Sequence, residues 1–139
     1  MSSEETFPLN SRILIADDST SSRDILMTEL KKLGYQNLMQ ATNGDEARGL
    51  LERANVDLLM SDVHMPSMTG IALLRWLRQE SQKKDLPVII LTSSTERSEI
   101  LEAARLNVNH YLLKPIMPKV LKQKLQVVWM KFKEQKSGV

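Results

Sequence analysis

Five short apolar runs alternate along the chain with stretches of helical periodicity. The apolar runs cover residues 12–16, 37–42, 56–60, 87–91 and 111–113. The run at 56–60 is almost continuously apolar, which is typical of a strand that is covered on both faces. Between the runs, apolar residues recur at steps of three and four, which predicts amphipathic helices. Regular alternation of this kind predicts an α/β fold, in which helices cover both faces of a doubly wound sheet of five parallel strands.

Polar and turn-forming residues mark the ends of the predicted helices. Ser19 to Ser22 are good helix starters because their hydroxyls cap free backbone amides, and Gly34 closes the first helix. Asn43-Gly44 is typical of a turn, and Asn107 stands where a left-handed residue often ends a helix. The core stripe of the last helix consists of Leu121, Leu125, Val128 and Phe132.

Length and composition indicate one ordinary domain. The chain has 139 residues, 42% hydrophobic and 26% charged, enough for a single core. We expect residues 1–10 to be a flexible lead on which Phe7-Pro8-Leu9 docks, residues 11–134 to form the domain, and residues 135–139 to be a frayed tail.

Charge and cysteine content exclude several classes of function. The net charge of +2 is too small to indicate nucleic-acid binding by itself. The chain has no cysteine, which excludes disulfides and thiolate metal sites. No apolar run approaches the ~18 residues of a membrane helix, and the polar amino terminus lacks the apolar core of a signal peptide. We therefore expect a cytoplasmic protein that binds neither membrane nor nucleic acid.

Candidate chemistry lies where four of the predicted strands end. These ends carry Asp17-Asp18, Asp62, Thr92 and Lys114. In a parallel sheet these ends share one edge, and neighbouring strands are about 4.8 Å apart. Asp62 alone would be interpreted as a turn cap, but three converging carboxylates are unfavourable unless a cation joins them.

The residue types at this edge suit phosphoryl transfer. A small set of carboxylate oxygens suits Mg²⁺, which also accepts a phosphoryl oxygen. Lys114 offers a positive charge and Thr92 a hydroxyl, both able to bind a phosphoryl group. Because an Asp carboxylate can itself attack phosphorus, the pattern favours metal-assisted phosphoryl transfer to an Asp.

These motifs together resemble the receiver domain of two-component response regulators. The resemblance covers about residues 11–134 and rests on four motifs: Ile13 to Ser19, Asp62 to Pro66 with Met68 and Gly70, Leu91 to Ser93, and Lys114-Pro115. We expect no output domain after residue 139, so the chain looks like the stand-alone, chemotaxis-type regulators. The resemblance implies a flavodoxin-like sheet with strand order 2-1-3-4-5.

The resemblance also implies the metal site and the residue that is phosphorylated. Asp62 matches the phosphoacceptor of the family. Asp18, Asp62 and the main-chain carbonyl of His64 would bind Mg²⁺, with Asp17 nearby, through water. The implied cofactor is therefore Mg²⁺ alone.

The remaining motif residues imply how the phosphoryl group is held and sensed. Thr92 and Lys114 would contact its oxygens, and Thr92 and Tyr111 match the switch residues of the family. The peptide bond before Pro115 is often cis in this family, an isomer that proline makes accessible.

Two positions depart from the family pattern. Thr69 stands where an Asp usually precedes the glycine, and we expect little effect. Asn107-Val108 stands where Gly-Ala is usual, but Asn tolerates a left-handed backbone, so we expect the turn to survive.

The implied partners are a sensor histidine kinase or phosphotransfer protein and a downstream protein target. The target would bind the fourth helix, fifth strand and last helix, and the chain would be a monomer or weak dimer. The last helix carries a basic surface that is either simply solvated or a docking face for an acidic partner: Lys119, Lys122, Lys124, Lys131, Lys133 and Lys136.

Four alternatives to a phosphorylated switch fit the sequence less well. A Mg²⁺-dependent phosphohydrolase with an Asp nucleophile usually has a second Asp where this chain has His64, and no cap insertion is present. A flavin-binding module needs a glycine-containing phosphate loop, which Ser19 to Ser22 does not provide. A non-phosphorylated scaffold does not explain the complete set of site residues. Finally, His64 and His110 lack a third ligand for zinc.

Overall fold

The computed structural model describes residues 5–93 and 97–136, in which five strands alternate with five helices. In chain order the elements are β1 (Arg12–Ala16), α1 (Thr20–Lys32), β2 (Asn37–Ala41), α2 (Gly44–Arg53), β3 (Leu58–Asp62), α3 (Gly70–Gln79), β4 (Val88–Thr92), α4 (Arg97–Arg105), β5 (His110–Leu113) and α5 (Pro118–Lys136).

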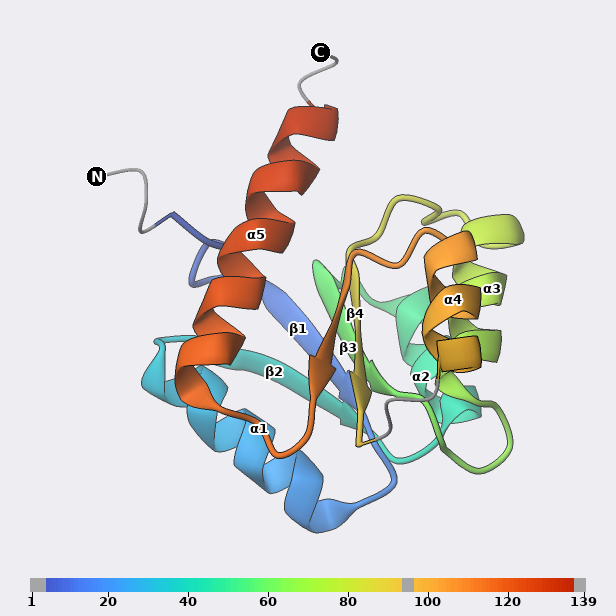
Figure 1. The fold of residues 1–139 in the computed structure, drawn as a ribbon, viewed down its shortest axis with the longest axis horizontal. Coiled ribbons are helices and arrows are strands. Elements are labelled where there is room, and N and C mark those ends of the chain that lie inside the picture. Colours follow the sequence, from blue (N-terminus) through green and yellow to red (C-terminus); the bar gives the residue numbers. More distant parts are fainter. Residues whose placement is uncertain (1–4, 94–96, 137–139) are drawn as a thin grey trace.

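The strands form one parallel sheet with the order β2-β1-β3-β4-β5. Helices α1 and α5 cover one face, and α2, α3 and α4 cover the other (Figure 1). The predicted fold class and strand order are therefore confirmed. The register pairs Asp62 on β3 with Leu91 on β4, so the carboxyl ends of the central strands meet at one edge.

The sheet divides the hydrophobic core into two layers. Successive strand residues point to opposite faces, so Leu58 and Met60 join the layer under α1 and α5, whereas Leu59 joins the layer under α2 to α4. All three side chains are buried. This explains why β3 is continuously apolar in sequence.

The helix ends follow the predicted chemistry, with one difference. Ser19 caps α1 by accepting a hydrogen bond from the Ser22 amide at 3.2 Å, and Gly34 and Asn107 have positive φ values of 106° and 59°. Asn43 was interpreted as part of a turn, but its side chain accepts a hydrogen bond from the Glu46 amide at 2.8 Å and begins α2 directly.

Phe7 of the amino-terminal segment packs against Trp129 of α5 and binds Tyr35, which lies between α1 and β2. The Phe7 side chain is only 2% exposed, and its ring lies 5.1 Å from that of Trp129. The Tyr35 hydroxyl donates to the Phe7 carbonyl at 2.8 Å. Docking of Phe7 is therefore observed, while Leu9 stays largely exposed.

The predicted ends of the domain are described only in part. Helix α5 continues to Lys136, so the first two residues of the expected tail, 135 and 136, are helical. Residues 1–4 of the lead and 137–139 of the tail lie outside the described part of the chain. No helix in the described ranges is long and apolar enough to cross a membrane.

Candidate functional site

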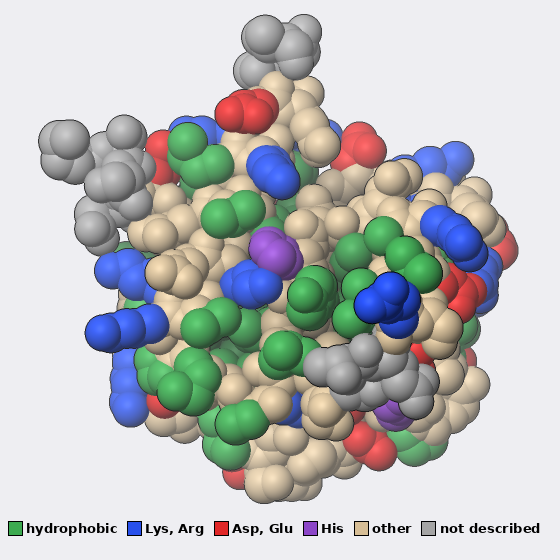
Figure 2. All heavy atoms as spheres, viewed as in Figure 1, with side chains coloured by type: hydrophobic (Ala, Val, Ile, Leu, Met, Phe, Trp, Pro, Cys, Tyr) green, Lys and Arg blue, Asp and Glu red, His purple; other side chains and the backbone are tan. Residues whose placement is uncertain are grey.

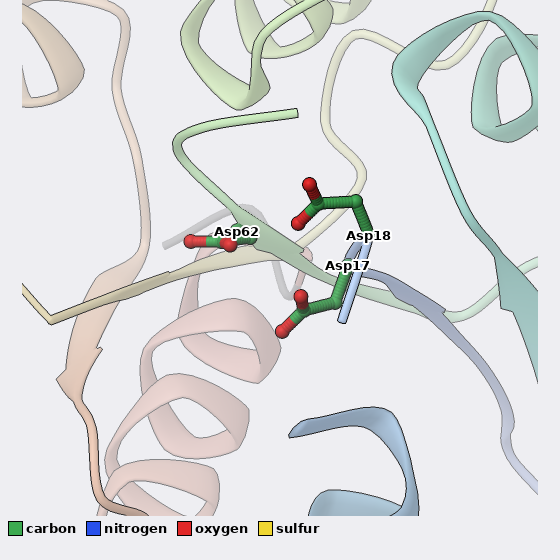
Figure 3. A group of neighbouring side chains, drawn as sticks. All are labelled: Asp17, Asp18 and Asp62. Carbon is green, nitrogen blue, oxygen red and sulfur yellow. The ribbon is translucent and has the colours of Figure 1, made fainter. Parts of the chain in front are cut away.

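Three carboxylates meet at the carboxyl edge of the sheet. Asp17 and Asp18 follow β1, Asp62 ends β3, and one carboxylate oxygen from each lies within 4.8 Å of the others (Figure 3). The side chains of Asp17 and Asp62 are 1% and 13% exposed, whereas Asp18 is exposed. The predicted convergence of these three residues is confirmed.

Lys114 brings a positive charge to this cluster. It follows β5, and its side chain extends past the end of β4 to reach β1 and β3. Its Nζ donates to Asp17 Oδ2 at 2.7 Å and to Asp62 Oδ2 at 3.3 Å. Burial alone would lower the pKa of Lys114, but the hydrogen bond to Asp17 and the charge of Asp62 raise that pKa above its usual value. Lys114 is therefore a permanent cation at neutral pH.

The carboxyl group of Asp62 is in an unfavourable electrostatic environment. Burial raises its pKa and the charge of Asp17 adds to this, whereas Lys114 and the Val63 amide, which donates to Oδ1 at 2.9 Å, oppose the increase. The net direction is upward. A cation at this position would stabilise the ionised form.

The oxygen atoms of the cluster fit a hard divalent cation. Both Asp17 oxygens accept hydrogen bonds, Oδ1 from the Ser19 amide at 2.9 Å and Oδ2 from Lys114. Asp18 is exposed and offers its carboxylate to solvent. An oxygen-only set in which part of the site is open to water is what Mg²⁺ prefers, because it retains several waters.

The loop between β3 and α3 packs against the backbone of Asp62. The Gly70 amide donates to the Val63 carbonyl at 2.9 Å, and Thr69 caps α3 by accepting a hydrogen bond from the Ala72 amide at 3.1 Å. A Cβ atom at Gly70 would lie 2.1 Å from the Asp62 carbonyl oxygen. Only glycine therefore fits here, and Thr69 performs the capping that its position requires.

His64 points toward α4. Its side chain is 66% exposed, and Nε2 lies 3.1 Å from Oε2 of Glu99, in the first turn of α4. No motif in the sequence marks Glu99 as a residue near the site.

A small apolar cavity separates Thr92 from Tyr111. It has a volume of about 140 Å³, and its walls include Thr92, Ile100, Val108 and Tyr111. Thr92 is buried and Tyr111 is half-buried. The Nζ atom of Lys124 lies 4.7 Å from the centre of the Tyr111 ring, which is the geometry of a cation–π contact.

The backbone after β5 has the isomer that the family resemblance implied, because the Lys114-Pro115 peptide bond is cis. A cavity of about 700 Å³ is lined by residues that include Phe7, Trp129 and Phe132. None of the strand-end carboxylates lines it, so it is separate from the carboxylate cluster.

Comparison with known proteins identifies the family. The family model described as response regulator receiver domain matches residues 13–126. The chain is 41% identical over 118 residues to the chemotaxis protein CheY of Pseudomonas aeruginosa, covering 85% of this chain and 95% of that protein. It is 38% identical over 120 residues to CheY-3 of Vibrio cholerae, covering 86% and 92%.

Solved structures give the same result. Chemotaxis response regulator CheY4 of Vibrio cholerae superposes with a TM-score of 0.77 at 34% identity, covering 86% of this chain and 98% of that one. A CheY-like receiver domain protein from Methanospirillum hungatei superposes with a TM-score of 0.80 at 25% identity, covering 94% and 99%. The chain therefore belongs to the family of response regulator receiver domains.

Proposed function

We propose that Asp62 is the residue on which this receiver domain accepts a phosphoryl group. The observation that supports this most is the position of its carboxylate, 3.3 Å from the Lys114 ammonium and within 4.8 Å of the other two acids. Asp62 Oδ2 attacks phosphorus as the bond from phosphorus to the donor breaks, so the donor's imidazole or acetate departs with that electron pair, and Lys114 stabilises the charge that develops on the transferring group. CheY-like receivers receive signals from histidine kinases, so the donor is a sensor kinase or phosphotransfer protein.

Asp18, Asp62 and the main-chain carbonyl of His64 would hold Mg²⁺, with Asp17 beside them. Together with the Lys114 ammonium, the ion would balance the charge of the three carboxylates, and when bound it would orient the phosphoryl oxygens. The chain's own residues do the rest. Lys114 fixes Asp17 and Asp62 relative to each other, and Thr92 offers a hydroxyl at the neighbouring strand end.

Phosphorylation with a small donor tests the assignment of Asp62. Wild type and Asp62→Asn are treated with acetyl phosphate and Mg²⁺, and the adduct is located by mass spectrometry. The control is Asp57→Asn, because Asp57 precedes the opposite end of the same strand and accepts a hydrogen bond from the Arg12 amide at 2.8 Å. We expect the adduct in wild type and in Asp57→Asn only. An equal adduct in Asp62→Asn would contradict the assignment.

We further propose that Thr92 and Tyr111 transmit phosphorylation to the surface. The phosphoryl group adds negative charge and acceptor oxygens, toward which the Thr92 hydroxyl moves. The cavity between Thr92 and Tyr111 supplies space into which the ring of Tyr111 can turn. A rotamer change of this kind needs a bias of only a few kcal/mol.

The surface that would change is formed by α4, β5 and α5. Exposed apolar side chains lie on it, including Leu101, Leu113, Met117 and Val127. Figure 2 shows apolar side chains on this face with Lys and Arg side chains around them. Apolar contact with a basic rim suits a protein partner that carries acidic groups.

NMR spectroscopy separates this relay from a passive role. Chemical shifts are compared between the apo and beryllofluoride-bound protein, in wild type and in Thr92→Ala. We expect the shifts at Tyr111 and α5 to be large in wild type and much smaller in Thr92→Ala. Equal shifts in both proteins would remove Thr92 from the relay.

A further inference from the structure

The contact between His64 and Glu99 joins the phosphorylation loop to α4 and is used by none of the chemistry described so far. Nε2 of His64 lies 3.1 Å from Oε2 of Glu99. We propose that Glu99 is a positioning residue: it holds the His64 imidazole against α4 and away from Asp62, so that water keeps access to the phosphorylated carboxylate. The proposal rests on Asp62 being the phosphoacceptor.

The two partners differ in how firmly the protein holds them. The Glu99 side chain is 23% exposed and lines the cavity that also contacts Thr92 and Tyr111. The His64 side chain is 66% exposed, so little packing selects its rotamer. Glu99 is therefore the anchor, and the imidazole is the part that moves if the contact is lost.

The backbone around His64 is restrained, so movement is confined to its side chain. The Val63 amide donates to Asp62 Oδ1 at 2.9 Å, and the Val63 carbonyl accepts from Gly70 at 2.9 Å. The Met68 amide donates to the Pro66 carbonyl at 2.7 Å. Because these bonds fix the loop on both sides of residue 64, loss of Glu99 leaves the main-chain carbonyl of His64 in place.

The position of His64 in the chain gives the direction of the effect. His64 is two residues beyond Asp62 in the loop that follows β3, and in our proposal its side chain covers the carboxylate when it is not bound to α4. A released imidazole would shield the aspartyl phosphate from water and lengthen its lifetime. Contacts between partly exposed polar side chains are weak, and their typical strength corresponds to about a two- to fivefold change in population.

The decay of the aspartyl phosphate tests the proposal. Protein phosphorylated with acetyl phosphate is freed of donor, and the remaining adduct on Asp62 is followed by mass spectrometry. The variants are Glu99→Ala, Glu99→Gln, His64→Ala and the double variant His64→Ala with Glu99→Ala. The matched control is Glu102→Ala, one turn further along α4, because Glu102 pairs with Arg75 of α3 instead of His64.

We expect Glu99→Ala to lengthen the half-life about two- to fivefold, and Glu99→Gln, which keeps an acceptor oxygen, to change it less. Glu102→Ala should decay like wild type. In the His64→Ala background the Glu99 substitution should have no further effect, a non-additivity that a merely structural role would not produce.

Three results would overturn the inference. They are an unchanged or shorter half-life in Glu99→Ala, an equal lengthening in Glu102→Ala, and an equal lengthening in the His64→Ala background. Failure of the proposed function is a separate result, because the adduct would then be missing from wild type or present in Asp62→Asn before any decay is measured. Urea unfolding of each variant confirms that it is folded, and Glu99→Gln carries the test if Glu99→Ala is not.

Discussion

Two alanine substitutions of glycine should have opposite effects on stability, because their surroundings differ. Gly70 is the first residue of α3 and lies against the backbone of Asp62, the proposed phosphoacceptor. A Cβ atom there would be 2.1 Å from the Asp62 carbonyl oxygen and 3.0 Å from its carbonyl carbon. Backbone must therefore move by about an ångström, and overpacking of this kind costs about 2–3 kcal/mol.

Gly49 provides the matched control. It lies inside α2, and the nearest atom to its added Cβ would be Nη1 of Arg53 at 3.0 Å, the far end of a flexible side chain. Alanine has a higher helix propensity than glycine, so Gly49→Ala should stabilise the protein by about 0.5–1 kcal/mol. The same chemical change is thus expected to have opposite signs at the two positions.

Urea unfolding and phosphorylation kinetics measure the two consequences. Gly70→Ala should lower the urea midpoint and should also slow phosphorylation by acetyl phosphate by about 10- to 100-fold, because a displacement near 1 Å would misplace Asp62, the proposed nucleophile. Gly49→Ala should raise the midpoint and leave the rate unchanged. A Gly70→Ala protein with wild-type stability and wild-type rate would refute the reasoning.

Three further substitutions test the metal site, the effect of pH and the packing of α3. Asp18→Asn should weaken Mg²⁺ binding at least about tenfold by calorimetry without destabilising the apoprotein, because it removes one repelling charge; Asp24→Asn, on the exposed face of α1, should bind like wild type. Burial, followed by the charges of nearby lysines, lowers the pKa of His110, so the folded protein binds its proton less readily than the unfolded chain. Stability should therefore be highest above the unfolded pKa of about 6.5 and fall as the pH drops below it, and His110→Gln should reduce this loss between pH 7.5 and 5.5; an unchanged slope would contradict the assignment. Arg78→Met should lower the free energy of unfolding by about 3 kcal/mol, measured in urea, because the half-buried guanidinium donates to backbone carbonyls, including that of Asn107 at 3.0 Å, and a loss below about 0.5 kcal/mol would contradict this.

The fold was predictable because burial on both faces leaves a direct record in the sequence. Leu58, Leu59 and Met60 are all apolar since consecutive residues enter different layers of the core. Chain direction and strand order then follow from helical crossovers and from the family resemblance. At Asn43-Gly44 the chain does bend between β2 and α2, but the sequence alone does not show that Asn43 also caps the helix, because the same residues form turns and caps, and the hydrogen bond to Glu46 is what identifies the cap.

The carboxylate cluster was predictable for a topological reason. Parallel strands bring their carboxyl ends to one edge, so Asp17 and Asp62 must be neighbours once β1 and β3 are adjacent. Contacts outside that edge were not predictable in the same way. His64 and Glu99 are separated by 35 positions, and their contact depends on the rotation of α4 about its axis, which the apolar periodicity of a nine-residue helix defines only coarsely.

The electrostatics of the site explain why its residues suit a reversible signal. Asp62 is partly buried beside Asp17, so burial raises its pKa, and repulsion raises it further. Lys114 reduces this cost, and its position between the two carboxylates, at 2.7 Å and 3.3 Å, leaves Asp18 on the solvent side, where we propose that Mg²⁺ binds. Without that ion the cluster lacks full compensation, and with it the carboxylates can remain ionised and reactive. We therefore expect the uncompensated charges to make the apoprotein less stable at this edge, and metal binding and phosphorylation to be favourable there. A salt bridge with a purely structural role would instead have its charges fully paired in the apoprotein.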